Sequence, residues 1–218
     1  MFTGIIESIG EIVSLQPSGG DMRLRINTGK LDLSDVQLGD SIAVNGVCLT
    51  AVELPGDGFW ADVSGETLSL TCVGQWQKGQ SVNLEKALTP TTRLGGHLVS
   101  GHVDGIGKVL NRWDDARSVK FQIEVADELA KYIAHKGSVC VDGTSLTVNA
   151  VDGAVFELNI VPHTLQETIM SQYQQATQVN IEVDLLARYL ERLLQGEQAA
   201  VSGGSIDMAF LNEHGFVK

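Results

Sequence analysis

The stretch SIAVNGVCLT at residues 41–50 returns as SVCVDGTSLT at residues 138–147, an offset of 97 positions. In each copy, two short runs rich in β-branched and apolar residues flank an Asn-Gly or Asp-Gly pair. These pairs are preferred two-residue turns of β-hairpins, because both central residues must adopt positive φ. Each copy therefore predicts a tight hairpin, and their agreement predicts that the fold is duplicated.

The same offset relates the two halves over most of their length. Residues 1–85 align with residues 98–182 without a gap and share 19 identities, whereas unrelated sequences of ordinary composition agree at roughly one position in 15. The identities are clustered, as in Phe59 with Phe156. Because solenoid repeats are shorter than this, the chain of 218 residues is predicted to contain two small domains of one fold.

Each half is predicted to be mostly strand. Several short strands separated by turn residues favour a small antiparallel barrel, which closes and leaves no exposed edge. Residues 127–136 and 184–198 instead carry apolar residues at helical spacing. The second segment lies beyond the repeat, so its apolar stripe predicts either packing on its own domain or an oligomerisation helix. The stripe consists of Leu185, Leu186, Tyr189, Leu190, Leu193 and Leu194. Residues 201–218 are expected to form a loose tail.

Composition excludes several classes of function. The chain has 15 Lys and Arg against 27 Asp and Glu, a net charge of −12, which repels phosphate backbones and anionic lipid and argues against nucleic acid or a membrane surface as partner. No apolar run reaches the ~18 residues of a membrane span. The first basic residue, Arg23, comes too late for a secretory signal. Because Cys48, Cys72 and Cys140 fit no disulfide or zinc pattern, we expect a protein of the reducing cytoplasm.

A duplicated fold offers two related pockets, which suits a reaction between two identical molecules. Residues that differ between the halves would then make the chemistry asymmetric. Cys48 is equivalent to Ser145, and His102 is equivalent to Ile5. A lone cysteine is usually a small buried hydrophobe, and a lone histidine is usually structural. His102, however, ends the glycine-rich segment GGHLVSGH at residues 95–102, where the backbone can approach a ligand closely.

Other equivalent pairs leave two interpretations open. Gly4 and Gly101 either form turns or let the backbone approach a flat ligand. Thr50 and Thr147 are either ordinary strand residues or hydroxyls that line a pocket. The two histidines of segment 95–102 are five positions apart, and no further residues complete a four-ligand metal site. A Gly-x-Gly-x-x-Gly or Walker loop for phosphate is also missing.

Five motifs, taken in order, are similar to those of the riboflavin synthase family, the trimeric type with two lumazine-binding domains. They are MFTGIIE at residues 1–7, NGVCLT at 45–50, GGHLVSGH at 95–102, DGTSLT at 142–147 and VNIEVD at 179–184. The resemblance runs from residue 1 to about residue 194. It implies a mainly β fold of two tandem six-stranded Greek-key barrels related by internal duplication, plus a C-terminal α-helix.

The resemblance also implies an activity and an assembly. The domains would be an N-terminal lumazine-binding barrel at residues 1–97, a C-terminal one at 98–184, a trimerisation helix at 185–200 and a flexible tail at 201–218. The reaction would be dismutation of two 6,7-dimethyl-8-ribityllumazine molecules to riboflavin and 5-amino-6-ribitylaminouracil, the last step of riboflavin biosynthesis, without cofactor or metal. The site would form between the first barrel of one subunit and the second barrel of its neighbour in a homotrimer, with lumazine synthase as a candidate associate.

Individual residues receive roles from the resemblance. His102 is the candidate for proton transfer, because the reference pKa of histidine lies near neutrality. Cys48, Ser41 and Asp184 are candidates for activating the nucleophile or stabilising the adduct, with water or the ribityl hydroxyl as the alternative nucleophile. The first pocket would comprise Gly4, Ile5, Ile6, Cys48, Leu49, Thr50, Asp62, Val63, Ser64, Gly65, Glu66 and Thr67. The second would comprise Gly101, His102, Val103, Ser145, Leu146, Thr147, Asn159, Ile160, Val161, Pro162, His163 and Thr164, and Lys136 would reach a ligand from the neighbouring barrel.

The main rival is a binding protein of the lumazine-protein type, which resembles this family, binds one chromophore and performs no synthesis. That type loses the histidine of the second half, whereas this sequence keeps His102 and the Ser-Leu-Thr run at residues 145–147. A flavin reductase would need a nicotinamide site, for which the sequence has no motif. The sequence therefore favours the synthase over the binder.

Overall fold

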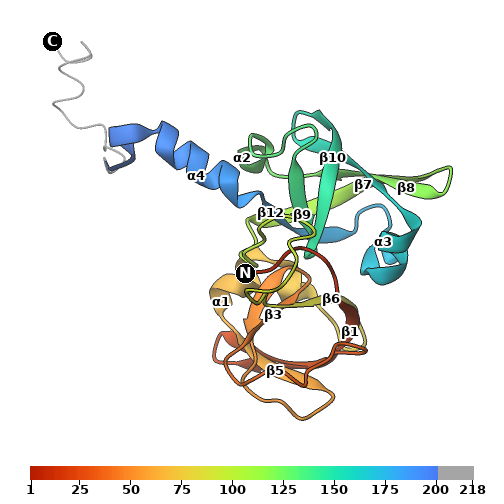
Figure 1. Cartoon of the computed structure of the whole chain (residues 1–218), viewed down its shortest axis with the longest axis vertical. Helices are drawn as coiled ribbons and strands as arrows, with labels where there is room; N and C mark the ends of the chain where they lie inside the picture. Colours follow the sequence, from red (N-terminus) through yellow and green to blue (C-terminus); the bar gives the residue numbers. More distant parts are fainter. Residues whose placement is uncertain (201–218) are drawn as a thin grey trace. The chain divides into compact units, whose positions relative to one another are not determined.

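The computed structural model describes residues 1–200, of which Met1–Leu185 form one compact unit that contains a curved six-stranded sheet, called the first barrel below, and a closed six-stranded barrel, called the second (Figure 1). The strands of the first barrel are β1 (Ser8–Ser18), β2 (Asp21–Asn27), β3 (Ser41–Val44), β4 (Val47–Thr50), β5 (Gly58–Val63) and β6 (Ser81–Lys86). Those of the second are β7 (Gly105–Asp115), β8 (Ser118–Glu124), β9 (Ser138–Val141), β10 (Thr144–Asp152), β11 (Val155–Ile160) and β12 (Gln178–Val183). The predicted mainly β fold with a duplicated six-stranded domain is confirmed.

Both sheets have the same antiparallel topology. The first has the order β4-β3-β6-β1-β2-β5, and the second has the equivalent order β10-β9-β12-β7-β8-β11 and closes because β10 pairs with β11. In the first barrel the corresponding join is an isolated bridge between Glu53 and Trp60. In each barrel the last strand lies between the first and the third, which produces the Greek-key connection.

The hairpins that define the repeat have the predicted turn conformation. Asn45 and Gly46 have φ values of 44° and 76°, and Asp142 and Gly143 have values of 43° and 82°. The two turns also face each other, because a Cβ built on Gly46 would lie 2.7 Å from the backbone nitrogen of Gly143. These positions therefore serve the junction of the barrels as well as the turn.

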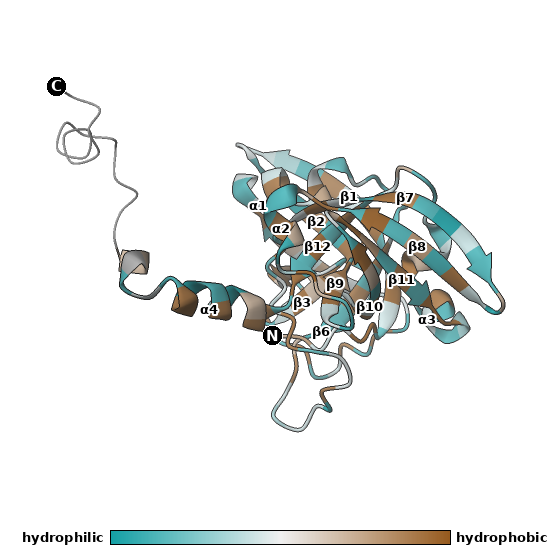
Figure 2. Cartoon of the chain, turned by 90° about the horizontal axis from the view of Figure 1, so that it is seen from above, coloured by the Kyte–Doolittle hydropathy of each residue, from teal (hydrophilic) through white to brown (hydrophobic). Residues whose placement is uncertain are grey.

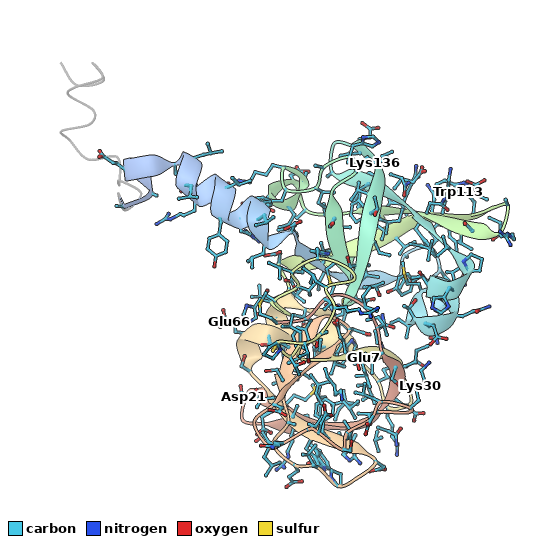
Figure 3. All side chains as sticks on the ribbon, viewed as in Figure 1. Glu7, Asp21, Lys30, Glu66, Trp113 and Lys136 are labelled. Carbon is cyan, nitrogen blue, oxygen red and sulfur yellow. The ribbon has the colours of Figure 1, made fainter. Side chains whose placement is uncertain are left out.

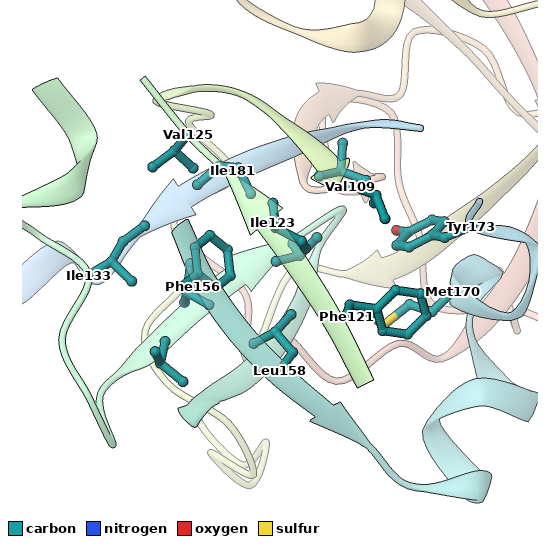
Figure 4. Packing of buried hydrophobic residues seen from close by; sticks show 14 of the residues in the cluster. Val109, Phe121, Ile123, Val125, Ile133, Phe156, Leu158, Met170, Tyr173 and Ile181 are labelled. Carbon is teal, nitrogen blue, oxygen red and sulfur yellow. The ribbon is translucent and has the colours of Figure 1, made fainter. Parts of the chain in front are cut away.

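Each barrel has its own hydrophobic core. Along β11 the side chains of Phe156, Leu158 and Ile160 alternate inward, as the period of a half-buried strand requires. Figure 4 shows this packing in the second barrel, where Phe121 meets Tyr173 edge to face at 5.9 Å. Figure 2 shows the hydrophobic residues along the strands and the more hydrophilic outer ends of β7 and β8. Phe59, the equivalent of Phe156, is fully buried in the first barrel.

A third, smaller core joins the barrels. It contains Phe2, Ala43, Val99 and Cys140, which form two pairs related by the offset of 97. The backbone N–H of Phe2 donates to the Val99 carbonyl at 2.7 Å, and the Val99 N–H donates back to the Phe2 carbonyl at 3.1 Å. The two halves therefore meet about a local pseudo-twofold axis.

Seven short helices complete the described chain. They are α1 (Gly65–Leu70), η1 (Cys72–Gln75), α2 (Asp127–Ala130), α3 (Pro162–Glu167), η2 (Ile169–Gln172), α4 (Leu185–Leu194) and η3 (Gly196–Ala200). The helix predicted over residues 127–136 was too long. After Ala130 the turns close by i to i+3 bonds, as from the Ile133 N–H to the Ala130 carbonyl, and Lys136 has a positive φ of 64° that no α-helix admits.

Two buried asparagines exchange hydrogen bonds between the barrels. Asn83 Nδ2 donates to the Asp142 carbonyl at 2.9 Å, and the equivalent Asn180 Nδ2 donates to the Asn45 carbonyl at 2.8 Å. Their Oδ1 atoms accept from the first N–H of η2 and of η1 respectively. Because a buried amide that loses its partners costs about 1–3 kcal/mol, each barrel satisfies a buried group of the other.

The chain from Leu186 onward forms a separate unit. Helix α4 ends four residues before the predicted end, and Gly196 follows with a φ of 55°, a left-handed conformation that favours glycine. The apolar side chains of the helix are largely exposed, namely Leu186, Tyr189, Leu190, Leu193 and Leu194. None of the helices in residues 1–200 has the length and apolar character that a membrane crossing requires. The tail predicted over residues 201–218 lies outside the described residues.

Candidate functional site

The structure exchanges two of the predicted pocket segments between the halves. The sequence grouped Gly4 with Cys48, and Gly101 with Ser145. In the structure the Ser145 N–H donates to the Gly4 carbonyl at 2.7 Å, and the Cys48 N–H donates to the Gly101 carbonyl at 2.9 Å. The grouping of these residues within each half was therefore wrong. It failed because the first segment of each half crosses the pseudo-twofold axis before its own barrel begins.

The two glycines allow this crossing. Gly4 and Gly101 have φ values of 76° and 81°, which disfavour side chains. A Cβ on Gly4 would lie 2.5 Å from the Ser145 Cβ, and one on Gly101 would lie 2.6 Å from the Cys48 Cβ. The close approach that the glycines permit is thus made to the strand of the opposite barrel. As a result, the segment that contains Gly4 lies beside Ser145, and the segment that contains Gly101 lies beside Cys48.

His97 contacts the predicted site residue Ser145, although the sequence-based prediction of the site did not include it. Its Nδ1 lies 2.7 Å from Ser145 Oγ, and its side chain is 8% exposed. The other ring nitrogen, Nε2, is buried and has no hydrogen-bond partner within residues 1–200. Burial lowers the pKa of His97, while the negative charge of Asp184 opposes that shift. The lowered pKa favours a neutral His97 ring, which is hydrogen-bonded to Ser145. The signal for His97 in the sequence is its place in the glycine-rich segment 95–102.

Cys48 is the accessible thiol among the three cysteines. It is half-buried at the start of β4, whereas Cys72 and Cys140 are buried. Burial raises the pKa of Cys72 to about 12 and raises that of Cys140 as well, so these two remain protonated and inert near neutrality. Cys48 alone has the exposure that a reacting group or ligand contact needs.

Ser41, at the start of β3, opens onto a cavity of about 680 Å³. Its lining also includes the predicted pocket residue Ile5 and several residues that were not predicted from the sequence: Lys86, Ala87, Leu88, Thr89, Thr92 and Arg93. All but Lys86 belong to the connection between the barrels, just beyond the aligned repeat. Their place between the two repeats is the feature of the sequence that sets them apart. The Lys86 Nζ donates to Asp35 at 2.6 Å.

The remaining strand-end segments lie at equivalent places in the two barrels. Asp62 to Thr67 run from the last two residues of β5 into α1, where the Ser64 side chain caps the helix by accepting from the Thr67 N–H. Asn159 to Thr164 run from the last two residues of β11 into α3, which begins at Pro162. Most of these side chains are exposed, and Thr50 and Thr147, on the equivalent strands β4 and β10, are exposed too.

Other predicted residues are separated within one chain. Lys136 projects from the second barrel, and Glu66 lies on the first (Figure 3). His102 is exposed, and its N–H donates to Ser100 Oγ at 3.2 Å. His163 is exposed on α3. Within residues 1–200, three or more potential metal ligands do not converge anywhere.

Comparisons with known proteins agree with this duplicated architecture. The family model described as "Lumazine binding domain" matches residues 3–87 and again residues 100–184. The riboflavin synthase of Photobacterium phosphoreum is 49% identical over 217 residues, which cover 100% of both chains. That of Bacillus subtilis (strain 168) is 41% identical over 216 residues, 99% of this chain and 100% of its own. That of Saccharomyces cerevisiae is 40% identical over 88% of this chain and 85% of its own.

Solved structures share the fold. The crystal structure of LumP complexed with riboflavin matches with a TM-score of 0.78 at 24% identity, over 84% of this chain and 99% of that one. LumP complexed with 6,7-dimethyl-8-(1'-D-ribityl) lumazine matches over the same shares with a TM-score of 0.76 at 23% identity. With two lumazine-binding domains and similarity along its whole length, the chain belongs to the riboflavin synthase family.

Proposed function

We propose that this chain is a transferase that converts two molecules of 6,7-dimethyl-8-ribityllumazine into riboflavin and 5-amino-6-ribitylaminouracil. The observation that carries the proposal is the pair of equivalent barrels with inequivalent residues at one position, Cys48 in the first and Ser145 in the second. Two copies of one substrate fit two related pockets, and a dismutation requires that the two copies be treated differently. Full-length relatives named riboflavin synthase support the same reaction.

The chemistry needs one acid–base group and one site of addition. The C7 methyl of one lumazine must lose a proton, and its anion is delocalised over the ring, so a modest base suffices. A nucleophile adds at C7 of the other lumazine, and a four-carbon unit then passes between the rings. In our proposal His102 moves the proton, and Cys48, Ser41 and Asp184 assist the addition. Stacking the two rings supplies much of the rate through effective molarity.

The proposed site needs a second subunit. Within one chain Lys136 and Glu66 lie on different barrels (Figure 3), and the apolar side chains of α4 are exposed. A homotrimer accounts for both observations. In it the α4 helices of the subunits pack against one another, and the first barrel of one subunit meets the second barrel of the next. A cytoplasmic location and an association with lumazine synthase complete the proposal.

The decisive experiment supplies the lumazine alone and follows riboflavin by absorbance. The wild-type chain is expected to form riboflavin and the uracil in equal amounts. His102→Ala is expected to lower kcat about 10²-fold or more, the scale of a lost acid–base group, with little change in lumazine affinity. Tight binding without turnover by the wild-type chain would instead identify a lumazine-binding protein, for which the LumP structures show a matching fold.

The proposed role of α4 in holding the trimer together is tested by placing charges on its apolar stripe. Leu190→Glu combined with Leu193→Glu places carboxylates on the apolar stripe, and we expect the trimer to dissociate into chains that sediment near 23.4 kDa. Arg192→Ala, on the polar face of the same helix, is the matched control and should leave the trimer intact. A trimer that survives the double substitution would contradict the assignment of α4.

A further inference from the structure

Two buried glutamates occupy equivalent positions near the end of the last strand of each barrel. Glu85 on β6 is 4% exposed and Glu182 on β12 is 3% exposed, and they are 97 positions apart. Neither forms an ion pair with a basic residue in the described part of the chain. A carboxylate that is removed from water without a cation depends on hydrogen-bond donors for its stability.

Each glutamate obtains these donors from the first segment of its own half. The Glu85 carboxylate accepts from the Thr3 N–H at 2.7 Å, from Thr3 Oγ1 at 2.6 Å and from the Gly4 N–H at 2.9 Å. The Glu182 carboxylate accepts from the Ser100 N–H at 2.5 Å, from Ser100 Oγ at 2.7 Å and from the Gly101 N–H at 2.9 Å. The two sets match donor for donor.

The glycine that ends each set makes the next contact in the opposite barrel. The Gly101 carbonyl accepts the Cys48 N–H, and the Gly4 carbonyl accepts the Ser145 N–H. A chain of direct contacts thus runs from Glu182 through Gly101 to Cys48, and from Glu85 through Gly4 to Ser145. Because the glycines also pack against these residues, a shift of either segment moves its partner.

We propose that Glu182 and Glu85 are positioning residues that act across the two barrels, Glu182 on Cys48 and Glu85 on Ser145. Their meaning for catalysis rests on the proposed function, but the mechanical coupling does not. Burial raises the pKa of both glutamates, and the surrounding N–H donors oppose that shift. The ionised form of each glutamate is therefore stabilised by the same segment that the glutamate holds in place.

The two couplings differ in the side-chain contacts that accompany them. Ser145 has a second support, because His97 Nδ1 lies 2.7 Å from its hydroxyl and the His97 N–H donates to the Thr3 carbonyl at 3.2 Å. No side chain in residues 1–200 makes an equivalent hydrogen bond to the Cys48 thiol. The position of Cys48 should therefore respond strongly to Glu182, whereas the response of Ser145 to Glu85 also passes through His97, which is anchored on the segment that Glu85 holds.

The test compares Glu182→Gln with Glu85→Gln in the full-length protein. Glutamine keeps the size of glutamate, but its amide NH₂ meets a backbone N–H where the carboxylate accepted one. The readout is the rate constant for alkylation of Cys48 by iodoacetamide without substrate, located by mass spectrometry, together with kcat and KM. We expect Glu182→Gln to raise the alkylation rate at least fivefold and to lower kcat about tenfold with KM changed less.

Glu85→Gln is the matched control, since it disturbs the equivalent hydrogen bonds of the other half and should change Cys48 alkylation less than twofold. If either variant unfolds, Ser100→Ala and Thr3→Ala remove only the hydroxyl donors and should show the same contrast at smaller size. Equal effects of both variants on Cys48, or none, would overturn the proposal. If the two variants differ clearly in Cys48 alkylation but the wild-type chain forms no riboflavin, the coupling is supported and the proposed function is refuted.

Discussion

Replacement of Gly101 by alanine is expected to remove most of the catalytic turnover and to lower the free energy of unfolding by about 3 kcal/mol. The residue has a φ of 81°, and an L side chain in the left-handed region costs roughly 1–2 kcal/mol. The new Cβ would also lie 2.6 Å from the Cys48 Cβ and 2.8 Å from Phe2 Cε2. Phe2 is fully buried at the junction of the barrels, so it has no room to yield, and overpacking costs another ~1–3 kcal/mol.

The loss of turnover follows from the same contact. The methyl group pushes Cys48 and the segment that ends in His102 apart, and displacements of about 1 Å at a reacting centre can cost about 10²-fold in rate. Stopped-flow turnover of the lumazine and urea denaturation followed by fluorescence measure the two effects.

Gly153→Ala is the matched control for the backbone cost. Gly153 also has a positive φ, of 57°, but a Cβ there would meet nothing within 4 Å. This variant should lose about 1 kcal/mol and retain wild-type turnover. If Gly101→Ala behaves like Gly153→Ala, then the contact with Cys48 has no bearing on the site.

The features that local chemistry determines could be predicted from the sequence. The Asn-Gly and Asp-Gly pairs demand positive φ at both positions, and that demand located both hairpins and the equivalence of the halves. Strand alternation then follows in runs such as β11, because the inward side chains are apolar. The predicted helices were longer than those observed, since spacing alone does not reveal that the turns after Ala130 are too tight for an α-helix.

The crossing of the first segments could not be predicted from the duplication. Grouping Gly4 with Cys48 and Gly101 with Ser145 preserves the offset of 97, but grouping Gly4 with Ser145 and Gly101 with Cys48 preserves it equally. The repeat is symmetric under this exchange, so it carries no information about which barrel each segment touches. Only the hydrogen bonds of the folded chain distinguish the two arrangements.

Asn83 and Asn180 illustrate the same limit. Both stand in clearly matched strand motifs, and a strand position with a polar residue ordinarily predicts an exposed face. In the structure they are 1% exposed and face the opposite barrel, where the buried surface is created by the duplication itself. Residues of this kind are recognised only once the two domains are placed together.

The second large effect is expected at Asp142, which is buried at the tip of the β9–β10 hairpin. Its Oδ1 accepts from the Asn180 N–H at 2.8 Å and its Oδ2 accepts from the Tyr173 hydroxyl at 2.5 Å. Burial is the larger influence and raises the pKa of Asp142 to about 7, although both hydrogen bonds oppose it. The equivalent residue, Asn45, accepts from the Asn83 N–H at 2.6 Å without carrying charge.

The sign of the pH dependence follows from the two pKa values. The ordinary value of 3.8 applies to the unfolded chain, and about 7 applies to the folded one. Between these values the folded state binds more protons, so this group makes the free energy of unfolding fall as the pH rises from about 4 to about 7. Three pKa units correspond to about 4 kcal/mol at about 1.36 kcal/mol per unit, and the loss is complete above that range.

Asp142→Asn should remove this dependence. The amide oxygen introduced by the substitution would still accept the Asn180 N–H, and the amide NH₂ would donate to the Tyr173 oxygen, although the Tyr173 O–H then loses its acceptor. We expect the free energy of unfolding at pH 8 to rise by about 2–4 kcal/mol relative to wild type, and the two proteins to converge near pH 4. Urea denaturation across this pH range measures the difference.

Asn45→Asp supplies the matched opposite change. It places a carboxyl at the equivalent turn of the first barrel, where Trp76 stands in the position of Tyr173 and offers no hydroxyl. With one donor fewer, the ionised form should be penalised at least as strongly, so the stability of this variant should fall more steeply than that of wild type as the pH rises from about 4, whereas the stability of Asp142→Asn should fall less steeply. If both variants follow the wild-type pH profile, the charge at this turn is not what sets it. A steeper profile for Asn45→Asp together with a shallower one for Asp142→Asn would show that a carboxyl at the junction of the barrels sets this part of the pH dependence.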